Sequence, residues 1–140
     1  RKIAAAVLRE RDRFAAWQVL EAGKNWMEAD ADVCEAIDFL NYYAAQAERL
    51  AGPQAIEVSG EHNRCCYRPR GVGLVIAPWN FPLAIFTGQI SAALMAGNGV
   101  LLKHAANVPG CADAIADAFD RPAPLTELNA DGFCGPLERF

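Results

Sequence analysis

Residues 71–82 have the sequence Gly71-Val72-Gly73-Leu74-Val75-Ile76-Ala77-Pro78-Trp79-Asn80-Phe81-Pro82, and this stretch is the strongest indicator of the fold. The apolar run predicts a buried strand over residues 71–77. Two prolines then restrict the backbone on either side of Asn80 and predict a rigid turn, with a helix beginning at Pro82. Turns of this kind present side chains and backbone N–H groups at the carboxyl edge of an α/β sheet, where ligands bind.

The segment that follows alternates between helical and strand patterns. We expect the helix to run to about residue 96, where Gly97-Asn98-Gly99 predicts a C-cap and turn. A buried strand over residues 100–103, a helix over 109–119 and a short strand over 125–128 come next. Strands that alternate with helices are typical of a parallel, doubly wound sheet, so the predicted fold class is α/β.

The first half of the chain is predicted to be helical up to a hairpin. Helices are expected over residues 2–10, from an N-cap at Asp12 to Gly23, and over 28–50, with Phe14, Trp17 and Leu20 on the inner side of the second. Glu28, Asp30 and Asp32 fit the solvated start of the third helix. Residues 54–70 predict a β-hairpin with a polar tip.

Composition excludes several classes of function. A net charge of −4 and a pI of about 5.1 argue against a nucleic-acid partner. No apolar run is long enough to cross a membrane, and the N-terminal residues predict a helix instead of a signal peptide. Five cysteines are too few and too irregular for a secreted disulfide scaffold, so we expect a cytoplasmic protein.

The candidate polar residues each have a structural alternative. Asn80 is either the tip of a rigid connector or an amide donor aimed at a developing negative charge, and the residues alone leave these two readings even. His62, Cys65 and Cys66 do not predict a metal site, because adjacent cysteines in a strand point to opposite faces. Cys34 and Cys111 lie in helical patterns and are expected to be small buried hydrophobes.

Residues 71–103 resemble the aldehyde dehydrogenase superfamily. Residues 21–26 and 85–90 look most like Δ1-pyrroline-5-carboxylate dehydrogenases, whereas residues 102–112 and 128–131 look more like succinate-semialdehyde dehydrogenases. The resemblance implies a partial Rossmann-like parallel sheet, preceded by helices and an oligomerisation-type hairpin. The motifs that carry it are Gly71-Val72-Gly73-Leu74-Val75-Ile76-Ala77-Pro78-Trp79-Asn80-Phe81-Pro82-Leu83-Ala84-Ile85, Ala92-Ala93-Leu94-Met95-Ala96-Gly97-Asn98 and Val100-Leu101-Leu102-Lys103.

The resemblance also implies roles for individual residues. Asn80 would bond the carbonyl oxygen of an aldehyde as it becomes an oxyanion. Lys103 would bond the adenosine ribose of NAD or NADP. The nicotinamide side of the cofactor cleft would be lined by Ile76, Ala77, Pro78 and Trp79.

Two departures from the family pattern matter. Most members that use NAD have a Glu three residues after this lysine, whereas this chain has Ala106, which makes NADP more plausible; His104 is expected to be a surface histidine. The segments that carry the nucleophilic cysteine and the general-base glutamate do not match any part of the chain. Cys134 follows Gly132-Phe133 but fits no family motif. We therefore expect no turnover from this chain alone.

The sequence predicts a division into helices over 1–53, a hairpin over 54–70, a partial cofactor domain over 71–131 and an unassigned tail over 132–140. The expected partners are an aldehyde substrate and either further copies of the chain or a full-length homologue. One alternative is a truncated, non-catalytic relative that acts as a binding or assembly module. Another is a degenerate product without a stable fold.

Overall fold

The computed structural model describes residues 1–120. It contains three helices, an antiparallel hairpin and a β-α-β-α unit, in the predicted order. The strand expected over 125–128, the tail over 132–140 and Cys134 lie outside the described residues. The elements are α1 (Lys2–Arg9), α2 (Arg11–Ala22), α3 (Trp26–Leu50), β1 (Gln54–Val58), β2 (Glu61–Cys65), β3 (Val72–Ile76), α4 (Ala84–Met95), β4 (Gly99–Lys103) and α5 (Pro109–Asp120).

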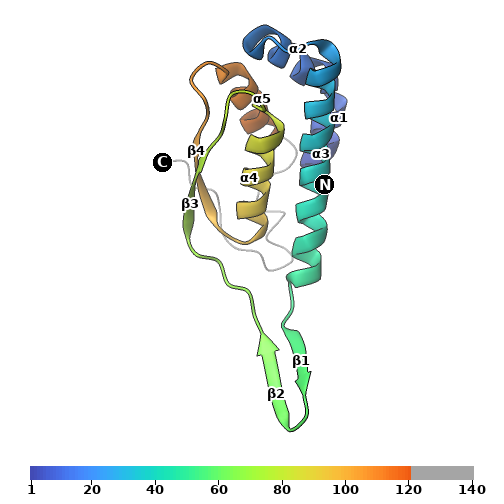
Figure 1. The fold of residues 1–140 in the computed structure, drawn as a ribbon, viewed down its shortest axis with the longest axis vertical. Coiled ribbons are helices and arrows are strands. Elements are labelled where there is room, and N and C mark those ends of the chain that lie inside the picture. Colours follow the sequence, from blue (N-terminus) through green and yellow to red (C-terminus); the bar gives the residue numbers. More distant parts are fainter. Residues whose placement is uncertain (121–140) are drawn as a thin grey trace.

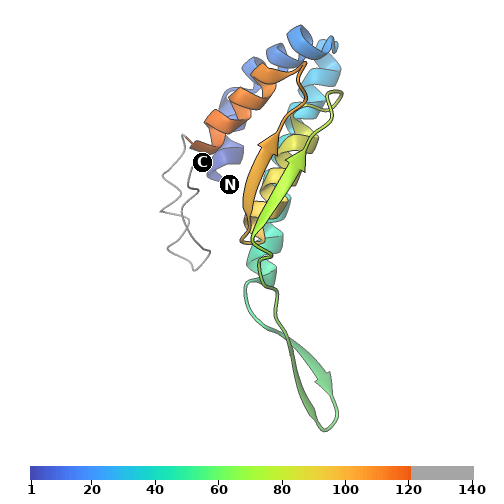
Figure 2. The same cartoon turned by 90° about the vertical axis from the view of Figure 1, so that its left-hand side faces the viewer.

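Strands β3 and β4 form a two-stranded parallel sheet, with a register that runs from Val72 opposite Gly99 to Ile76 opposite Lys103. Helix α4 connects the two strands and packs against the sheet (Figures 1 and 2). Val75 belongs to the core that this packing creates. The mixed α/β class and the parallel pair are thus confirmed, whereas the further strands of a doubly wound sheet are not among the described elements.

The prediction that both parallel strands are buried is wrong. Val72, Leu74 and Ile76 alternate with the inward residues of β3 and are 71%, 61% and 60% exposed. Leu101 and Leu102 on β4 are exposed too. An apolar strand is buried on both faces only when elements cover both, and α4 covers one. This part of the chain therefore leaves an open apolar face.

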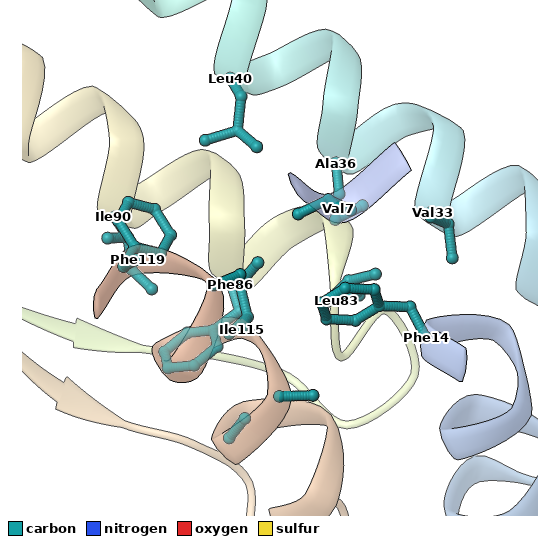
Figure 3. Packing of buried hydrophobic residues seen from close by; sticks show 14 of the residues in the cluster. Val7, Phe14, Val33, Ala36, Leu40, Leu83, Phe86, Ile90, Ile115 and Phe119 are labelled. Carbon is teal, nitrogen blue, oxygen red and sulfur yellow. The ribbon is translucent and has the colours of Figure 1, made fainter. Parts of the chain in front are cut away.

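The core lies between α4 and the N-terminal helices. Helix α3 runs alongside α4, α1 and α2 pack on α3, and α5 packs on α1 and α2 (Figure 2). Phe86 and Ile90 of α4 meet Ile115 and Phe119 of α5 in the centre of this cluster (Figure 3). The residues labelled there are Val7, Phe14, Val33, Ala36, Leu40, Leu83, Phe86, Ile90, Ile115 and Phe119. Buried apolar residues of α3, α4 and α5 thus belong to one cluster.

The structure corrects several predicted helix ends. Helix α2 starts after Glu10 and includes Asp12 in its first turn, so Asp12 is not its N-cap. Helix α3 starts at Trp26, because the Asn25 side chain accepts a hydrogen bond from the Glu28 N–H at 2.9 Å. Helix α4 starts at Ala84, not at Pro82.

The end of α2 agrees with its predicted stop, but one of its inward residues does not. Gly23 has a φ of 68°, the left-handed conformation that glycine adopts at a helix C-terminus. Leu20 lies just before this end and is 78% exposed, so its predicted place on the inner face is wrong. Phe14 is buried and Trp17 packs against the core, as predicted.

The hairpin of β1 and β2 extends away from the helices beyond the end of α3 (Figure 1). Its two-residue turn contains Gly60 with a φ of 83°, in agreement with the predicted polar tip. Ile56 and Val58 are 52% and 47% exposed. The hairpin is thus confirmed, and within residues 1–120 no third strand pairs with it. None of the helices described here is long and apolar enough to span a membrane.

Candidate functional site

The turn that carries Asn80 is held at both ends. At its start, the Ala77 N–H donates to the Lys103 carbonyl at 3.2 Å and so extends the parallel pairing by one bond. At its end, Leu83 and Ala84 are buried in the core. Asn80 between them is exposed, and its amide makes no hydrogen bond to any described residue. An exposed amide on an anchored turn is available to an external acceptor.

The aromatic residues beside Asn80 are also exposed. Trp79 is 55% exposed and Phe81 is 42% exposed. Trp79 is therefore not a core residue of this part of the chain. Ala77 and Pro78 are half-buried. The turn thus presents two large aromatic side chains and one amide on the outside of the molecule.

Lys103 lies at the same edge as the turn. It ends β4 directly opposite Ile76, the last residue of β3. Its side chain is exposed, and Nζ lies 3.5 Å from the His104 carbonyl oxygen. The sheet register therefore places Lys103 opposite Ile76, and residues 77–80 continue the chain directly from β3. Their individual roles stay predictions.

The loop between β4 and α5 follows Lys103 directly. The Val108 N–H donates to the Ala105 carbonyl at 3.2 Å, which closes a turn around the exposed Ala106. His104 is half-buried, and its Nδ1 lies 2.8 Å from the Ala105 carbonyl oxygen. Because residue 106 is alanine, this position of the loop carries no carboxylate side chain.

Glu21 caps helix α5, a contact that sequence reasoning missed. Its carboxylate oxygens accept from the Gly110 N–H at 2.7 Å and the Cys111 N–H at 2.9 Å. These N–H groups lie in the first turn of a helix, where they have no partner within the helix. Burial, and then the adjacent Glu21 carboxylate, raise the pKa of Cys111 to about 12. Cys111 is thus buried, as predicted, whereas Cys34, which was also predicted to be buried, is only half-buried.

A buried carboxylate, that of Asp32, serves helix α4 in a similar way. Asp32 is 2% exposed, so the prediction that it forms a solvated helix start is wrong. Its Oδ1 accepts from the Ala84 N–H at 3.2 Å, and its Oδ2 lies 3.1 Å from the Lys24 ammonium. Lys24 also donates to Gln18 Oε1 at 3.0 Å. A buried carboxylate at a helix N-terminus is stabilised by the helix dipole and by this cation.

Lys24 also contacts the turn itself. Its Nζ lies 4.7 Å from the centre of the Phe81 ring, within the range of a cation–π interaction. The two capping contacts join residues 52 and 89–90 positions apart in sequence, so no local pattern predicts them. The only hint of these contacts in the sequence is that charged residues such as Lys24 lie around the junction between α2 and α3.

No three His, Cys, Asp or Glu side chains within residues 1–120 gather as metal ligands. His62 and Cys65 lie on β2 and Cys66 follows it, and the four cysteines of residues 1–120 are all free thiols.

Comparison with known proteins decides the family. The family model described as "Aldehyde dehydrogenase family" matches residues 1–128. The chain belongs to the aldehyde dehydrogenase family. A 1-pyrroline-5-carboxylate dehydrogenase of Geobacillus thermodenitrificans is 50% identical over 130 residues, which are 91% of this chain. The resemblance stated from the Asn80 turn is thus confirmed.

Solved structures of aldehyde dehydrogenase relatives show the same fold in this region. A 1-pyrroline-5-carboxylate dehydrogenase from Thermus with bound NAD matches 87% of the chain at 44% identity and a TM-score of 0.80. Proline utilization A from Bdellovibrio bacteriovorus matches 87% of it at 43% identity and a TM-score of 0.82.

The matched region is a small part of each relative. The chain spans 25% of the Geobacillus protein, 24% of the Thermus protein and 13% of proline utilization A. The similarity therefore covers the N-terminal part of the two dehydrogenases and extends over most of this chain.

Proposed function

We propose that this chain forms the cofactor-side part of an NAD(P)-dependent aldehyde dehydrogenase that oxidises a semialdehyde to a carboxylic acid. The observation that carries the proposal is the register of the parallel sheet. It ends β3 at Ile76 and β4 at Lys103 side by side, with the exposed Asn80 turn directly after Ile76. This is the carboxyl edge of a parallel sheet, the position at which α/β proteins bind ligands.

Asn80 is the proposed electrostatic residue. When a thiolate adds to an aldehyde, the carbonyl oxygen gains a negative charge. A neutral amide donor stabilises this charge without a proton transfer, and loss of one such donor typically costs about 2.7–4 kcal/mol of transition-state stabilisation. The exposed, unbonded amide of Asn80 suits this role, because no described contact would have to break first.

The proposed cofactor contacts divide between the two strands. Ile76, Ala77, Pro78 and Trp79 would contact the nicotinamide side through backbone and apolar groups, and Lys103 would donate to the ribose hydroxyls. The exposed apolar and cationic groups at this edge fit a nucleotide with a flat base and polar sugars. The bound cofactor would accept a hydride from the aldehyde adduct.

The choice of cofactor depends on Ala106 and Lys103. The Thermus relative is described with NAD bound, which supports NAD. A small residue at position 106 leaves no carboxylate to repel a 2′-phosphate, and the exposed Lys103 ammonium would attract one. We therefore propose that the site accepts both NAD and NADP.

The substrate class follows from the relatives. The Geobacillus relative is a 1-pyrroline-5-carboxylate dehydrogenase, and the two solved structures are that enzyme and proline utilization A. A semialdehyde is accordingly the proposed substrate, and a cytoplasmic location completes the proposal. Residues 1–120 contain no counterpart of the nucleophile segment, so we propose that the chain alone does not turn over.

The hairpin supports a second candidate, an assembly module. Both of its outer edges are unpaired within the described residues, and Ile56 and Val58 are exposed. Unpaired strands favour pairing with another chain. We propose further copies of this chain or a full-length homologue as the partner. The candidate predicts a concentration-dependent mass in analytical ultracentrifugation that a Val58→Lys variant abolishes.

Calorimetric titration with NAD⁺ and NADP⁺ tests the main proposal. The chain should bind at least one of them saturably, and Lys103→Ala should weaken binding about tenfold, which corresponds to one charge-assisted hydrogen bond. Arg64→Ala, which changes an exposed cation on the hairpin, is the matched control. Equal binding by both variants would remove Lys103 from the site. No binding, together with a cooperative melt, would favour the assembly module.

A further inference from the structure

Asn80 lies on a turn whose far end is capped by a residue from another helix. Helix α4 has Leu83 as its N-cap, and this residue supplies no capping side chain. The cap is instead Asp32 on α3, which accepts from the Ala84 N–H. The orientation of the turn thus depends on a carboxylate from another element.

The Asp32 carboxylate depends in turn on Lys24. Asp32 Oδ2 has no well-aligned hydrogen-bond donor, so the ammonium at 3.1 Å compensates its charge as an ion pair. The Lys24 side chain is 11% exposed and that of Asp32 is 1% exposed. Loss of the cation would leave a buried carboxylate unpaired, which a protein avoids by moving the group or protonating it.

Lys24 is fixed by its remaining contacts. Gln18 Oε1 accepts from its Nζ, and the amide nitrogen of Gln18, a completely buried residue, donates to the Ala29 carbonyl at 3.2 Å. The same Nζ faces the Phe81 ring. One ammonium thus contacts the residue after Asn80 and, through Asp32, the backbone four residues after it.

We propose that Lys24 and Asp32 are positioning residues for Asn80, and that this ion pair sets the direction of the Asn80 amide. The importance of this orientation rests on the proposed function of Asn80. The contacts themselves involve only residues of this chain and can be tested without a cofactor. Lys24 contacts the Phe81 ring and Asp32 binds the Ala84 N–H, and only residues 82 and 83 lie between these two contacts. Together the two contacts remove most of the conformational freedom of the turn. A third attachment, from Ala77 to Lys103, already fixes its start.

A matched control pair exists on the same helices. Arg11 of α2 and Asp30 of α3 form an ion pair that is about 40% exposed and does not contact the turn. Asp30→Asn therefore removes an α2–α3 ion pair without touching residues 77–84. A general effect of weakened helix packing would appear in this variant too.

The test is amide hydrogen exchange and side-chain NMR on the ¹⁵N-labelled chain without cofactor. The Asn80 side-chain signals are assigned by their loss in Asn80→Ala. Lys24→Met should speed exchange of the Ala84 N–H at least tenfold relative to the Ile90 N–H in the middle of α4, and should shift the Asn80 amide signals. Lys24→Arg should restore both, and Asp30→Asn should change neither.

The Asp32→Asn variant keeps the inference testable if Lys24→Met does not fold. It retains an oxygen acceptor for Ala84 but removes the charge that holds Lys24, so the Asn80 signals should shift while Ala84 stays protected. Unchanged Asn80 signals in a folded Lys24 or Asp32 variant, or equal changes in Asp30→Asn, would overturn the proposal. A cofactor titration that fails in the unsubstituted chain would instead count against the proposed function.

Discussion

Replacing Glu21 by Ala should destabilise the chain more than a substitution at a partly exposed helix residue usually does. The change removes the acceptor of two backbone N–H groups, those of Gly110 and Cys111, at 2.7 and 2.9 Å. Loss of a helix cap costs about 0.5–2 kcal/mol, and loss of a carboxylate from a helix N-terminus adds about 0.3–1 kcal/mol. We expect a decrease of about 2 kcal/mol in the free energy of unfolding.

Thermal unfolding followed by circular dichroism measures this decrease. For a chain of 140 residues, 1 kcal/mol corresponds to about 3 °C in Tm, so Glu21→Ala should lower Tm by about 6 °C. Glu21→Gln keeps one neutral acceptor and should lose about half as much. The control is Glu35→Ala, which changes an exposed glutamate on α3 and should shift Tm by less than about 2 °C. Equal Tm values for Glu21→Ala and Glu35→Ala would refute the capping argument.

The remaining predictions concern a thiol, the cofactor and a tight helix contact. The folded pKa of Cys111 is about 12 and its ordinary value is 9.0, so its contribution to stability is complete below pH 9 and is lost as pH rises toward 12. Urea unfolding should therefore show that a rise from pH 8 to pH 10 lowers the free energy of unfolding of the unsubstituted chain by about 1 kcal/mol more than that of Cys111→Ala. Equal decreases would contradict the burial of the thiol. Ala106→Glu should weaken NADP⁺ binding about tenfold relative to NAD⁺ by calorimetry, and an unchanged ratio would place the 2′-phosphate elsewhere. Gly88→Ala should lower the free energy of unfolding, measured in urea, by about 1 kcal/mol. The added Cβ would lie 2.9 Å from Phe39 Cδ2, and this overlap outweighs a helix-propensity gain of about 1 kcal/mol. A more stable variant would show that the Phe39 ring moves freely.

The sequence predicts the elements well because their signals are local. Gly23 and Gly97 mark helix ends through their positive φ values, and Pro109 marks a helix start. The β-α-β alternation predicts parallel strands that end together, and the structure pairs Ile76, at the end of β3, with Lys103, at the end of β4. These features depend on patterns within a few residues, which a single sequence contains.

The errors come from contacts between distant segments. Asp32 has the pattern of a solvated helix start, yet it is buried because α4 begins beside it. The apolar strand β3 has the pattern of a buried strand, yet Leu74 is exposed because no described element covers that face. Burial depends on which segments meet in space, and local periodicity does not contain that information.

An NMR titration of the ¹⁵N-labelled chain with NAD⁺ tests the central claim most directly. The account predicts saturable shifts that cluster at residues 76–80 and 103–106, including the Trp79 indole N–H, with the hairpin residues 54–65 unchanged. Shifts that cluster elsewhere, or no shifts from a folded chain at millimolar NAD⁺, would contradict the assignment of this sheet edge as a cofactor site.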